Sequence, residues 1–358
     1  MSSTWGTNIK LSIFGGSHTE AIGVVLDNLP ANEKIDLDAV RMQMARRAPG
    51  KDKTATTRAE ADEPQILSGL LNGITTGAPL AAIIQNTNTR PKDYSLLKTH
   101  PRPGHADYTA SIRYDGANDI RGGGHFSGRL TACLVFAGAV CRQILERRGV
   151  TVGAHALQIG AAKDSAFDPV HVSADVLNAL NTRFFAVNEA VAEQAMRDEI
   201  ENARLDADSI GGVIECAAVG MPAGIGSPMF GGVENILASI LYGIPAVKGV
   251  EFGAGFGVSA LRGSENNDAF YYGEDGHVYT ETNHAGGILG GITTGMPIVF
   301  RVAVKPTPSI GKIQNTVDLL EKKNDTLTVV GRHDPCIVPR AIPVVEAAAA
   351  IALLDMML

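Results

Sequence analysis

The chain of 358 residues is poor in cysteine and in aromatic residues, and it has no excess of basic ones: it contains 4 Cys, 1 Trp and 5% aromatic residues, with a formal net charge of −7. The cysteines at 133, 141, 216 and 336 never show a C-x-x-C spacing, so we expect no metal site and a reducing compartment. The acidic balance argues against nucleic-acid binding, because affinity for phosphate backbones requires an excess of Lys and Arg. An anionic ligand would therefore have to be held by local basic clusters.

Targeting signals and long apolar runs are also missing. Residues 1–5 lack the basic and apolar regions of a secretory signal. The longest apolar stretch, residues 341–358, is interrupted by Glu346 and Asp355 and is too short to cross a bilayer. We expect a soluble, cytoplasmic protein with no membrane partner.

Two common nucleotide-binding motifs are absent. The chain has no G-x-x-x-x-G-K-[ST] sequence, and the glycines at 253, 255 and 257 do not have the G-x-G-x-x-G spacing. A P-loop kinase and a simple nicotinamide-dependent dehydrogenase are thereby disfavoured.

The length favours one large domain or two closely packed halves. The hexapeptide Ile-Thr-Thr-Gly-Ala-Pro at 74–79 returns as Ile-Thr-Thr-Gly-Met-Pro at 292–297, and each copy precedes an apolar run. A weaker echo links residues 22–27 with 210–215, both predicted as short strands that precede a helix. The pattern indicates an internal duplication, with chance similarity between Gly-Thr turns as the alternative.

Three helical regions are predicted. Residues 127–148 and 341–358 are apolar on nearly every face, which is typical of buried helices. Residues 173–208 are charged and helical in pattern, as expected for the surface.

What the chain does contain is a set of glycine-flanked loops that carry histidine, at residues 14–20, 102–108, 121–129 and 331–336. His18 follows Ser17 at the end of a predicted strand, and His105 lies between Arg102, which could bind an anion, and Asp107, which could tune the imidazole. Because the pKa of histidine is ordinarily about 6.5, these residues suggest proton transfer on an anionic substrate. The isolated histidines at 100, 155, 171 and 277 are interpreted as structural.

Basic and hydroxyl side chains form two further candidate sites. Residues 46–53 could be a solvated helix end, but beside the other arginine loops a pocket for phosphate or carboxylate is the better interpretation. Residues 305–309, Lys-Pro-Thr-Pro-Ser, form either a simple turn or a cradle for phosphate. Asp334, near Arg332, is interpreted as an acid/base or orienting carboxylate rather than a metal ligand.

Taken in order, these motifs resemble the chorismate synthase family over essentially the whole chain. They are Gly-x-Ser-His at 15–18, Arg-Pro-Gly-His-Ala-Asp at 102–107, Arg-Gly-Gly-Gly at 121–124, Ala-Val-Lys-Gly-Val-Glu at 246–251, Asn-His-Ala-Gly-Gly-Ile at 283–288 and Gly-Arg-His-Asp-Pro-Cys at 331–336. The resemblance implies an α+β fold, a β-α-β sandwich with an internal pseudo-twofold, in a single domain spanning 1–358. Its related halves would cover about 10–150 and 205–358, with a helical surface insertion at about 170–208.

The resemblance also implies a function. The family's lyase converts 5-enolpyruvylshikimate 3-phosphate to chorismate and phosphate by anti-1,4 elimination, and it requires reduced FMN without net redox change. His18 would protonate the leaving phosphate, His105 would protonate reduced flavin, and Asp334 would help to relay the proton at flavin N5. NADPH would act only indirectly, through an external flavin reductant, and members of the family are as a rule homotetramers.

The binding residues that the resemblance implies fall into two groups. The substrate contacts are Ser17, Arg47, Lys53, Arg102, Ser127, Arg129 and Arg332. The FMN contacts are His125, Phe126, Ser127, Ala246, Gly290, Lys305, Pro306, Thr307, Pro308, Ser309 and Arg332. The chain departs from the family pattern at Gly16, where Glu is common, and at Ala48 and His125, where Arg is common. The loss of cations at 48 and 125 is expected to weaken binding of the flavin phosphate or the substrate.

Two other classes of function stay open at this point. A noncatalytic flavoprotein would keep the pocket without turnover, and a nicotinamide-dependent oxidoreductase would consume NAD(P)H together with its substrate.

Overall fold

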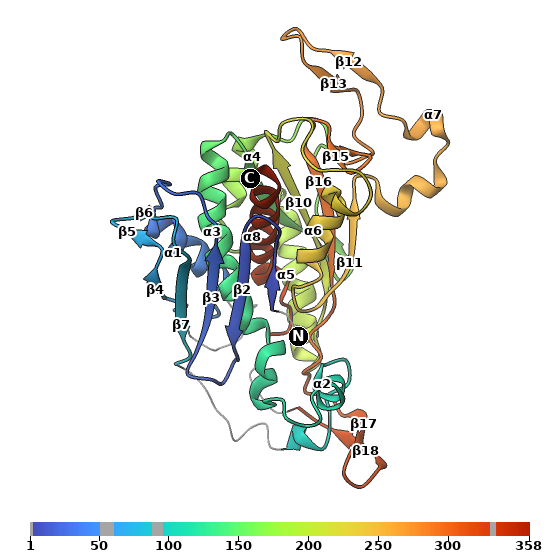
Figure 1. Cartoon of the computed structure of the whole chain (residues 1–358). Helices are drawn as coiled ribbons and strands as arrows, with labels where there is room; N and C mark the ends of the chain where they lie inside the picture. Colours follow the sequence, from blue (N-terminus) through green and yellow to red (C-terminus); the bar gives the residue numbers. More distant parts are fainter. Residues whose placement is uncertain (1–2, 51–60, 88–95, 330–333) are drawn as a thin grey trace.

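The computed structural model describes residues 3–50, 61–87, 96–329 and 334–358, and two five-stranded antiparallel sheets dominate this part of the chain (Figure 1). The first sheet has the order β1 (Thr4–Trp5), β2 (Lys10–Gly15), β3 (Ala21–Asp27), β7 (Leu80–Gln85) and β4 (Pro64–Ser68). The second has the order β11 (Val247–Phe252), β16 (Ile298–Val304), β10 (Gly212–Val219), β8 (Thr151–Ile159) and β9 (Ala162–Lys163).

Long apolar helices fill the space between the sheets. Helices α3 (Thr131–Arg147) and α8 (Val338–Met357) pack on each other, while α3 contacts β3 and α8 contacts β8 and β10. Their approach is close, because a Cβ added at Gly138 would lie 2.2 Å from Ala347. Helices α1 (Leu37–Arg47) and α6 (Val233–Leu241) complete this layer, α1 against α3 and α6 against α8. The predicted α+β sandwich is thus confirmed.

The two acidic residues within the apolar run of α8 have specific partners. Glu346 accepts hydrogen bonds from Arg46 at 2.5 Å and from the backbone N–H of Ala154 at 3.1 Å. Asp355 accepts from three successive N–H groups, those of Thr7, Asn8 and Ile9. A buried carboxylate is tolerated when it is paired in this way, so the charges tie α8 to the rest of the core.

The repeated hexapeptides make the same contacts twice. Thr75 in β6 (Ile74–Thr75) donates its hydroxyl to Pro30 O and accepts from the N–H of Glu33. Thr293 in β15 (Ile292–Thr293) donates to Pro222 O and accepts from Ile225 in the same manner. The strand order β2-β3-β7-β4 corresponds to β8-β10-β16-β11, so the two sheets repeat one topology.

Two helix starts differ from the predicted positions. Helix α3 begins at Thr131 rather than at 127, because Ser127 is extended and its hydroxyl caps the short turn η4 (Gly128–Leu130). Helix α8 begins at Val338, three positions before the predicted start, and Pro339 lies in its first turn, where an N–H is not required, while Pro343 stands inside the helix.

The remaining elements lie at the periphery. Helices α4 (Ala174–Leu180) and α5 (Ala190–Leu205) pack on β8, within the segment predicted as a helical insertion. Helix α7 (Gly263–Asn266) and the hairpin β12 (Phe270–Tyr272) with β13 (Val278–Thr280) form an arm that projects from the body (Figure 1). The shorter elements are β5 (Leu70–Leu71), η2 (Leu96–Lys98), α2 (Asp107–Arg113), η3 (Arg121–Phe126), η5 (Met229–Gly231), η6 (Gly255–Ala260), β14 (Ile288–Leu289), β17 (Gln314–Asp318) and β18 (Lys323–Leu327).

One segment of the described chain, Gly128–Arg147, is long and apolar enough to cross a membrane, but 83% of it is buried inside the protein. It corresponds to core helix α3, which is the reason for its apolar sequence.

Candidate functional site

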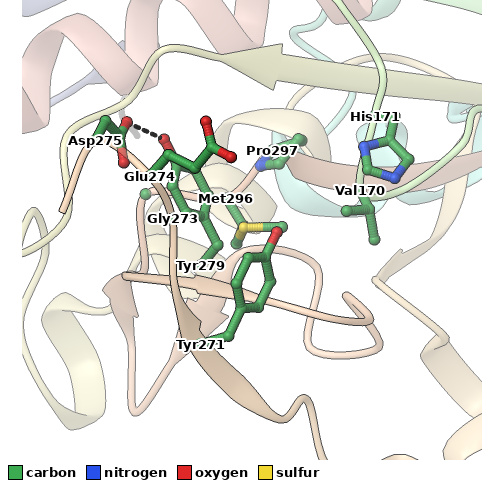
Figure 2. Close-up of a pocket in the computed structure, with 10 residues that line it drawn as sticks. Val170, His171, Tyr271, Gly273, Glu274, Asp275, Tyr279, Met296 and Pro297 are labelled. Atoms are coloured by element: carbon green, nitrogen blue, oxygen red, sulfur yellow. Dashed lines mark hydrogen bonds between the residues drawn. The ribbon is translucent and has the colours of Figure 1, made fainter. Parts of the chain in front are cut away.

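Two cavities compete as the functional site. The first, of about 450 Å³, lies between the arm and the body, where the Tyr279 hydroxyl donates to Asp275 at 2.8 Å (Figure 2). Its lining includes Glu274 and Asp275 but, among the described residues, no Lys or Arg. It is therefore poorly suited to a polyanion.

The second cavity, of about 700 Å³, has the opposite character and is called the basic cavity below. One carboxylate, that of Asp334, lines it together with six basic side chains: Arg47, Arg102, Arg129, Lys248, Lys305 and Arg340. Its volume falls in the range of small-molecule sites, about 300–1,000 Å³. It lies where the ends of α1, β16 and α6 meet the start of α8 and the loops around η3.

A glycine loop brings two predicted proton carriers close together. Gly122, Gly123 and Gly124 have φ values of 64°, 104° and 54°, which other residues rarely adopt. A Cβ on Gly122 would lie 2.1 Å from His18 Cε1, and one on Gly123 would lie 3.2 Å from His105 Nε2. The backbone of this loop therefore passes directly beside both imidazoles.

The two histidines differ in access. His105 lines the basic cavity, whereas His18 is 6% exposed and lies behind Gly122. Ser17 is buried beside His18, with its hydroxyl 3.1 Å from His18 Nδ1 and donating to Arg121 O. Because that hydroxyl proton goes to a carbonyl, the oxygen can accept the proton of His18 Nδ1. Ser17, predicted as a substrate contact, is 8% exposed in this arrangement.

His105 belongs to a buried group with Arg102 and Asp107. Asp107 Oδ1 lies 2.6 Å from His105 Nδ1, and Arg102 donates from Nε and Nη2 to the two carboxylate oxygens at 2.7 and 2.8 Å. Since the carboxylate accepts, His105 Nδ1 carries the proton, and its Nε2 is left for exchange on the side of the cavity. The guanidinium of Arg102 also donates to the Ser309 hydroxyl at 3.1 Å.

The charge of Asp107 is secured by its neighbours. Burial alone would raise the pKa of Asp107, but hydrogen bonds from Arg102 and His105 outweigh it and hold the pKa well below its ordinary value. The prediction that Asp107 tunes the imidazole agrees with this geometry. Arg102, predicted as an anion-binding cation, is instead largely occupied by that carboxylate.

A second buried group combines Arg47, Arg129 and a carboxylate that sequence reasoning missed, Asp62. Asp62 accepts from Arg47 Nη1 at 2.6 Å and forms a very short contact with Arg129 Nη1. Burial would raise the pKa of Asp62, but the two arginines lower it below its ordinary value. Burial lowers the pKa of Arg47, and Arg340 and Arg129 act in the same direction, which reflects three cations gathered at one place.

Asp334 also has a cationic partner. Arg340 forms a very short contact with the Asp334 carboxylate and donates from Nε to Arg47 O at 3.0 Å. Sequence reasoning missed Arg340. Arg340 could have been predicted as a site residue from its position near the start of α8, six residues after Asp334, where both side chains can face the same cavity.

Most residues predicted to hold a flavin also line the basic cavity. These are His125, Phe126, Ser127, Ala246, Lys305, Thr307, Pro308 and Ser309. Ala246 has a φ of 76°, a strained value for alanine that is typical of functional sites. Together the lining offers an ammonium, several hydroxyls and the 38% exposed ring of Phe126, a set that fits a phosphate-bearing, aromatic cofactor.

Some predicted residues lie elsewhere. Gly290 is in the turn between β14 and β15 and does not line the basic cavity, so its predicted flavin contact is not supported within one chain. Pro306 is absent from the lining and lies against Gly211 instead. Lys53 and Arg332 fall outside the described residues.

His125 lines the cavity, but both ring nitrogens already have partners. Nδ1 lies 2.8 Å from Gly15 O and must donate to it, while Nε2 lies 2.7 Å from the Ser3 hydroxyl. The side chain thus joins the glycine loop to the N-terminal strands. It has no remaining donor for a phosphate.

Comparison with known proteins agrees with this site. The family model described as Chorismate synthase matches residues 9–358. Chorismate synthases from Thermococcus kodakarensis and Dehalococcoides mccartyi are 46% and 44% identical, over 99% and 100% of this chain and 97% of each relative. A solved structure, Crystal Structure of Chorismate Synthase, superposes with a TM-score of 0.78 at 26% identity and covers 99% of this chain and 92% of that one.

The family model and the curated relatives extend over nearly the whole chain, and the solved structure has the same fold. Four of the six motifs that carried the resemblance, at 102–107, 121–124, 246–251 and 331–336, also contribute residues to the basic cavity. The chain is therefore an enzyme of the lyase class and belongs to the chorismate synthase family.

Proposed function

We propose that this enzyme converts 5-enolpyruvylshikimate 3-phosphate to chorismate and phosphate by anti-1,4 elimination, with reduced FMN as an obligatory cofactor and no net redox change. The observation that carries the proposal is the basic cavity itself. His105 and Asp334 line it among six basic side chains, and His18 lies directly behind its glycine wall.

The charges of the cavity support the choice of this substrate. A phosphate and two carboxylates need several cations, and guanidinium groups match such oxyanions with paired hydrogen bonds. Among the described residues, Arg47 and Arg129 share the carboxylate of Asp62, so two guanidinium groups lie together at this side of the cavity, where they could face an oxyanion. We propose that Arg47, Arg102, Arg129 and Ser127 contact the substrate, together with Ser17, Lys53 and Arg332.

Three groups would hold or move protons. The Nδ1–H of His105 donates to Asp107, so its Nε2 can exchange a proton with a molecule in the cavity. His18 would supply the proton to the leaving phosphate. Its imidazole lies directly beside Gly122, which has no side chain. Asp334, fixed by Arg340, would take part in the relay of the ring proton.

Reduced FMN would occupy the part of the cavity lined by Phe126, Ser127, Ala246, Lys305, Thr307, Pro308 and Ser309. When bound, it supplies the electron that allows the phosphate bond to break. Thr307 donates its hydroxyl to Asp334 O at 2.9 Å, so this chain itself joins the proposed cofactor loop to the proposed proton carrier. Arg102 connects the same loop to the His105 group through Ser309.

The test is an anaerobic assay of the purified protein with chemically reduced FMN and the proposed substrate, in which chorismate and phosphate are followed together. Equal appearance of both products, absent with oxidised FMN, is the expected result. Tight binding of flavin and substrate without product would contradict the lyase and favour a noncatalytic flavoprotein.

We further propose that the flavin is reduced by an external reductant, with NADPH acting only through it, because no part of the chain resembles a flavin-reductase domain. The purified chain should then turn over with dithionite but not with NADPH under anaerobic conditions. NADPH-driven turnover by the chain alone would contradict this.

A homotetramer in the cytoplasm completes the proposal. Several large apolar side chains are exposed, including Phe230 at 85%, Phe256 at 86% and Tyr272 at 78%, and exposed apolar surface commonly marks protein interfaces. The four cysteines are buried free thiols, which supports a reducing compartment. Light scattering on the purified protein tests the tetramer, and a monomer at micromolar concentration would contradict it.

A further inference from the structure

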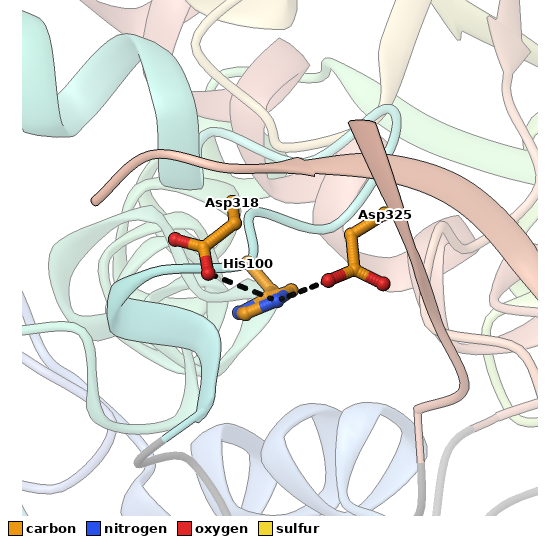
Figure 3. A group of neighbouring side chains, drawn as sticks. All are labelled: His100, Asp318 and Asp325. Carbon is orange, nitrogen blue, oxygen red and sulfur yellow. Dashed lines mark hydrogen bonds and ion pairs between the residues drawn. The ribbon is translucent and has the colours of Figure 1, made fainter. Parts of the chain in front are cut away.

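Three potential metal ligands meet outside the basic cavity. His100 follows η2, and Asp318 and Asp325 come from the hairpin of β17 and β18 (Figure 3). Their ligand atoms all lie within 4.8 Å of one another. We propose that these three side chains bind a divalent first-row transition ion, for which Zn²⁺ is the best-suited probe.

The spacing of the ligand atoms suits such an ion. His100 Nε2 lies 3.3 Å from Asp325 Oδ2 and 3.8 Å from Asp318 Oδ2. Two ligands that each lie about 2.1 Å from a tetrahedral Zn²⁺ are about 3.4 Å apart, so only small side-chain shifts are needed. The Asp325 side chain is 38% exposed, which lets water supply the remaining position.

Neighbouring groups orient all three ligands before an ion arrives. The Thr99 hydroxyl lies 2.8 Å from His100 Nδ1 and donates to Leu96 O at 3.3 Å, so it accepts the Nδ1 proton. Asp318 Oδ1 accepts from two backbone N–H groups, those of Leu320 and Glu321, and Asp325 Oδ1 accepts from the N–H of Thr326. One carboxylate oxygen of each aspartate is thereby left to face His100.

The three ligand atoms face a common point. When Nδ1 of His100 donates to Thr99, Nε2 is the ring nitrogen that is left for a metal, and it lies opposite one oxygen of each aspartate. A divalent ion at this point would offset the charges of both carboxylates. Mixed nitrogen and oxygen ligands with an open position favour Zn²⁺ over Ca²⁺, which prefers six to eight oxygens.

The site would act on the loop that carries His105. The hairpin already contacts this loop, because Thr316 donates its hydroxyl to Pro101 O at 2.5 Å and the N–H of Leu319 bonds to Thr99 O at 2.9 Å. A bound ion would add a third link, two residues before Arg102. We therefore expect the ion to raise thermal stability and to brace the position of Arg102 and His105.

The test is calorimetric titration of the full chain with Zn²⁺ after treatment with EDTA, repeated with Mn²⁺ and Ca²⁺. We expect one Zn²⁺ per chain and a higher melting temperature in its presence. Asp325→Asn should weaken this binding about 100-fold or more, and Thr99→Val, which removes only the partner of Nδ1, about 10-fold. His277→Gln is the control, since His277 is exposed and has a single carboxylate, Asp275, at 3.3 Å.

Several outcomes would overturn the proposal. They are Zn²⁺ binding that is unchanged in both His100→Ala and Asp325→Asn, the absence of binding in the wild type, and binding of Ca²⁺ alone. Melting curves in EDTA show whether each variant folds, which separates loss of the site from loss of the structure. None of these readouts depends on catalytic turnover, so the result is independent of the proposed lyase activity.

Discussion

Two buried arginine–carboxylate groups beside the basic cavity resemble each other in composition but differ in the number of cations per carboxylate. In the Asp62 group, one carboxylate serves two cations, Arg47 and Arg129. In the Asp107 group, one carboxylate serves one cation, Arg102, and one imidazole, that of His105. Among the described residues, the first group thus has one cation more than it has carboxylates, whereas the second has equal numbers of both apart from the imidazole.

This difference suggests that the two groups have different functions. A surplus of positive charge in a buried place favours binding of an oxyanion, since such interactions strengthen where water is excluded. A neutral pair beside a histidine instead fixes a tautomer and a ring orientation, as in other acid/base sites. The predictions below test whether one group mainly binds and the other mainly positions a proton carrier.

The largest effect on folding stability is expected from Asp62→Asn. Removal of the carboxylate that Arg47 and Arg129 share leaves two like charges close together in a buried site, which should cost about 3–5 kcal/mol of folding stability. Urea denaturation at neutral pH measures this. Asp107→Asn, which strands only one arginine, is the matched comparison and should cost less.

An equal or larger loss in Asp107→Asn would show that the two groups do not differ in surplus charge. Added phosphate sharpens the test, because an anion can replace the missing carboxylate. Phosphate should recover more stability in Asp62→Asn than in Asp107→Asn.

The second prediction concerns rate. His105→Ala should lower kcat about 100-fold or more, as expected for loss of a general acid/base group. Asp107→Asn should lower kcat less and shift its pH profile, because the imidazole remains but loses its orienting carboxylate. Anaerobic turnover of both variants, with flavin affinity measured separately, checks the order.

His171→Gln is the control, since His171 lines the cavity beside the arm rather than the basic cavity. A normal rate in His105→Ala would exclude His105 as a proton carrier.

The third prediction uses the glycine loop. In Gly122→Ala the new Cβ would lie 2.1 Å from the ring of His18, so the imidazole must shift, and we expect the rate to fall about 10-fold or more. Gly149→Ala is the matched control, because Gly149 also has a positive φ, 81°, but no heavy atom within 4 Å of the added Cβ. It should show only backbone strain, about 1–2 kcal/mol, with normal turnover.

The sequence alone was sufficient for the fold and for most members of the site. The apolar runs predicted both core helices, since helices buried on all sides must be apolar on all sides. The repeated Ile-Thr-Thr-Gly indicated the duplication because each threonine hydroxyl makes the same two bonds within its half. The histidine loops could be identified because binding and catalytic residues lie disproportionately on loops, and four loops of this chain combine glycine with histidine.

Which carboxylate pairs with which arginine was much harder to predict from the sequence. Asp62 lies fifteen residues after Arg47 in a charged segment, where nothing distinguishes a buried carboxylate from a solvated one. The sequence therefore predicted Arg47, Arg102 and Arg129 as open cations, although the fold gives each of them a carboxylate partner. Likewise, the burial of His18 behind Gly122 depends on how distant loops pack, which local patterns do not encode.

The fourth prediction concerns pH. The folded-state pKa of Asp107 is lower than its ordinary value of 3.8, so its contribution to stability is fully present above that value and is lost as pH falls through the folded-state pKa. The difference in unfolding free energy between wild type and Asp107→Asn should thus be largest near neutral pH and shrink toward pH 2. Urea denaturation across this range measures it, and a difference that grows with acidity would contradict the pairing.

The smallest effect on ligand binding is expected at His125, which belongs to neither the Asp62 group nor the Asp107 group. Its two ring nitrogens lie 2.8 Å from Gly15 O and 2.7 Å from the Ser3 hydroxyl, so it holds the glycine loop against the N-terminal strands. His125→Gln should change the affinity for flavin and substrate less than about threefold, since the lost contacts are internal hydrogen bonds worth about 1 kcal/mol each. His125→Arg, which restores the residue common in the family, separates the two interpretations: tighter flavin binding would mean that the position faces the ligand after all, whereas unchanged affinity with lower stability would assign it to the support of the loop.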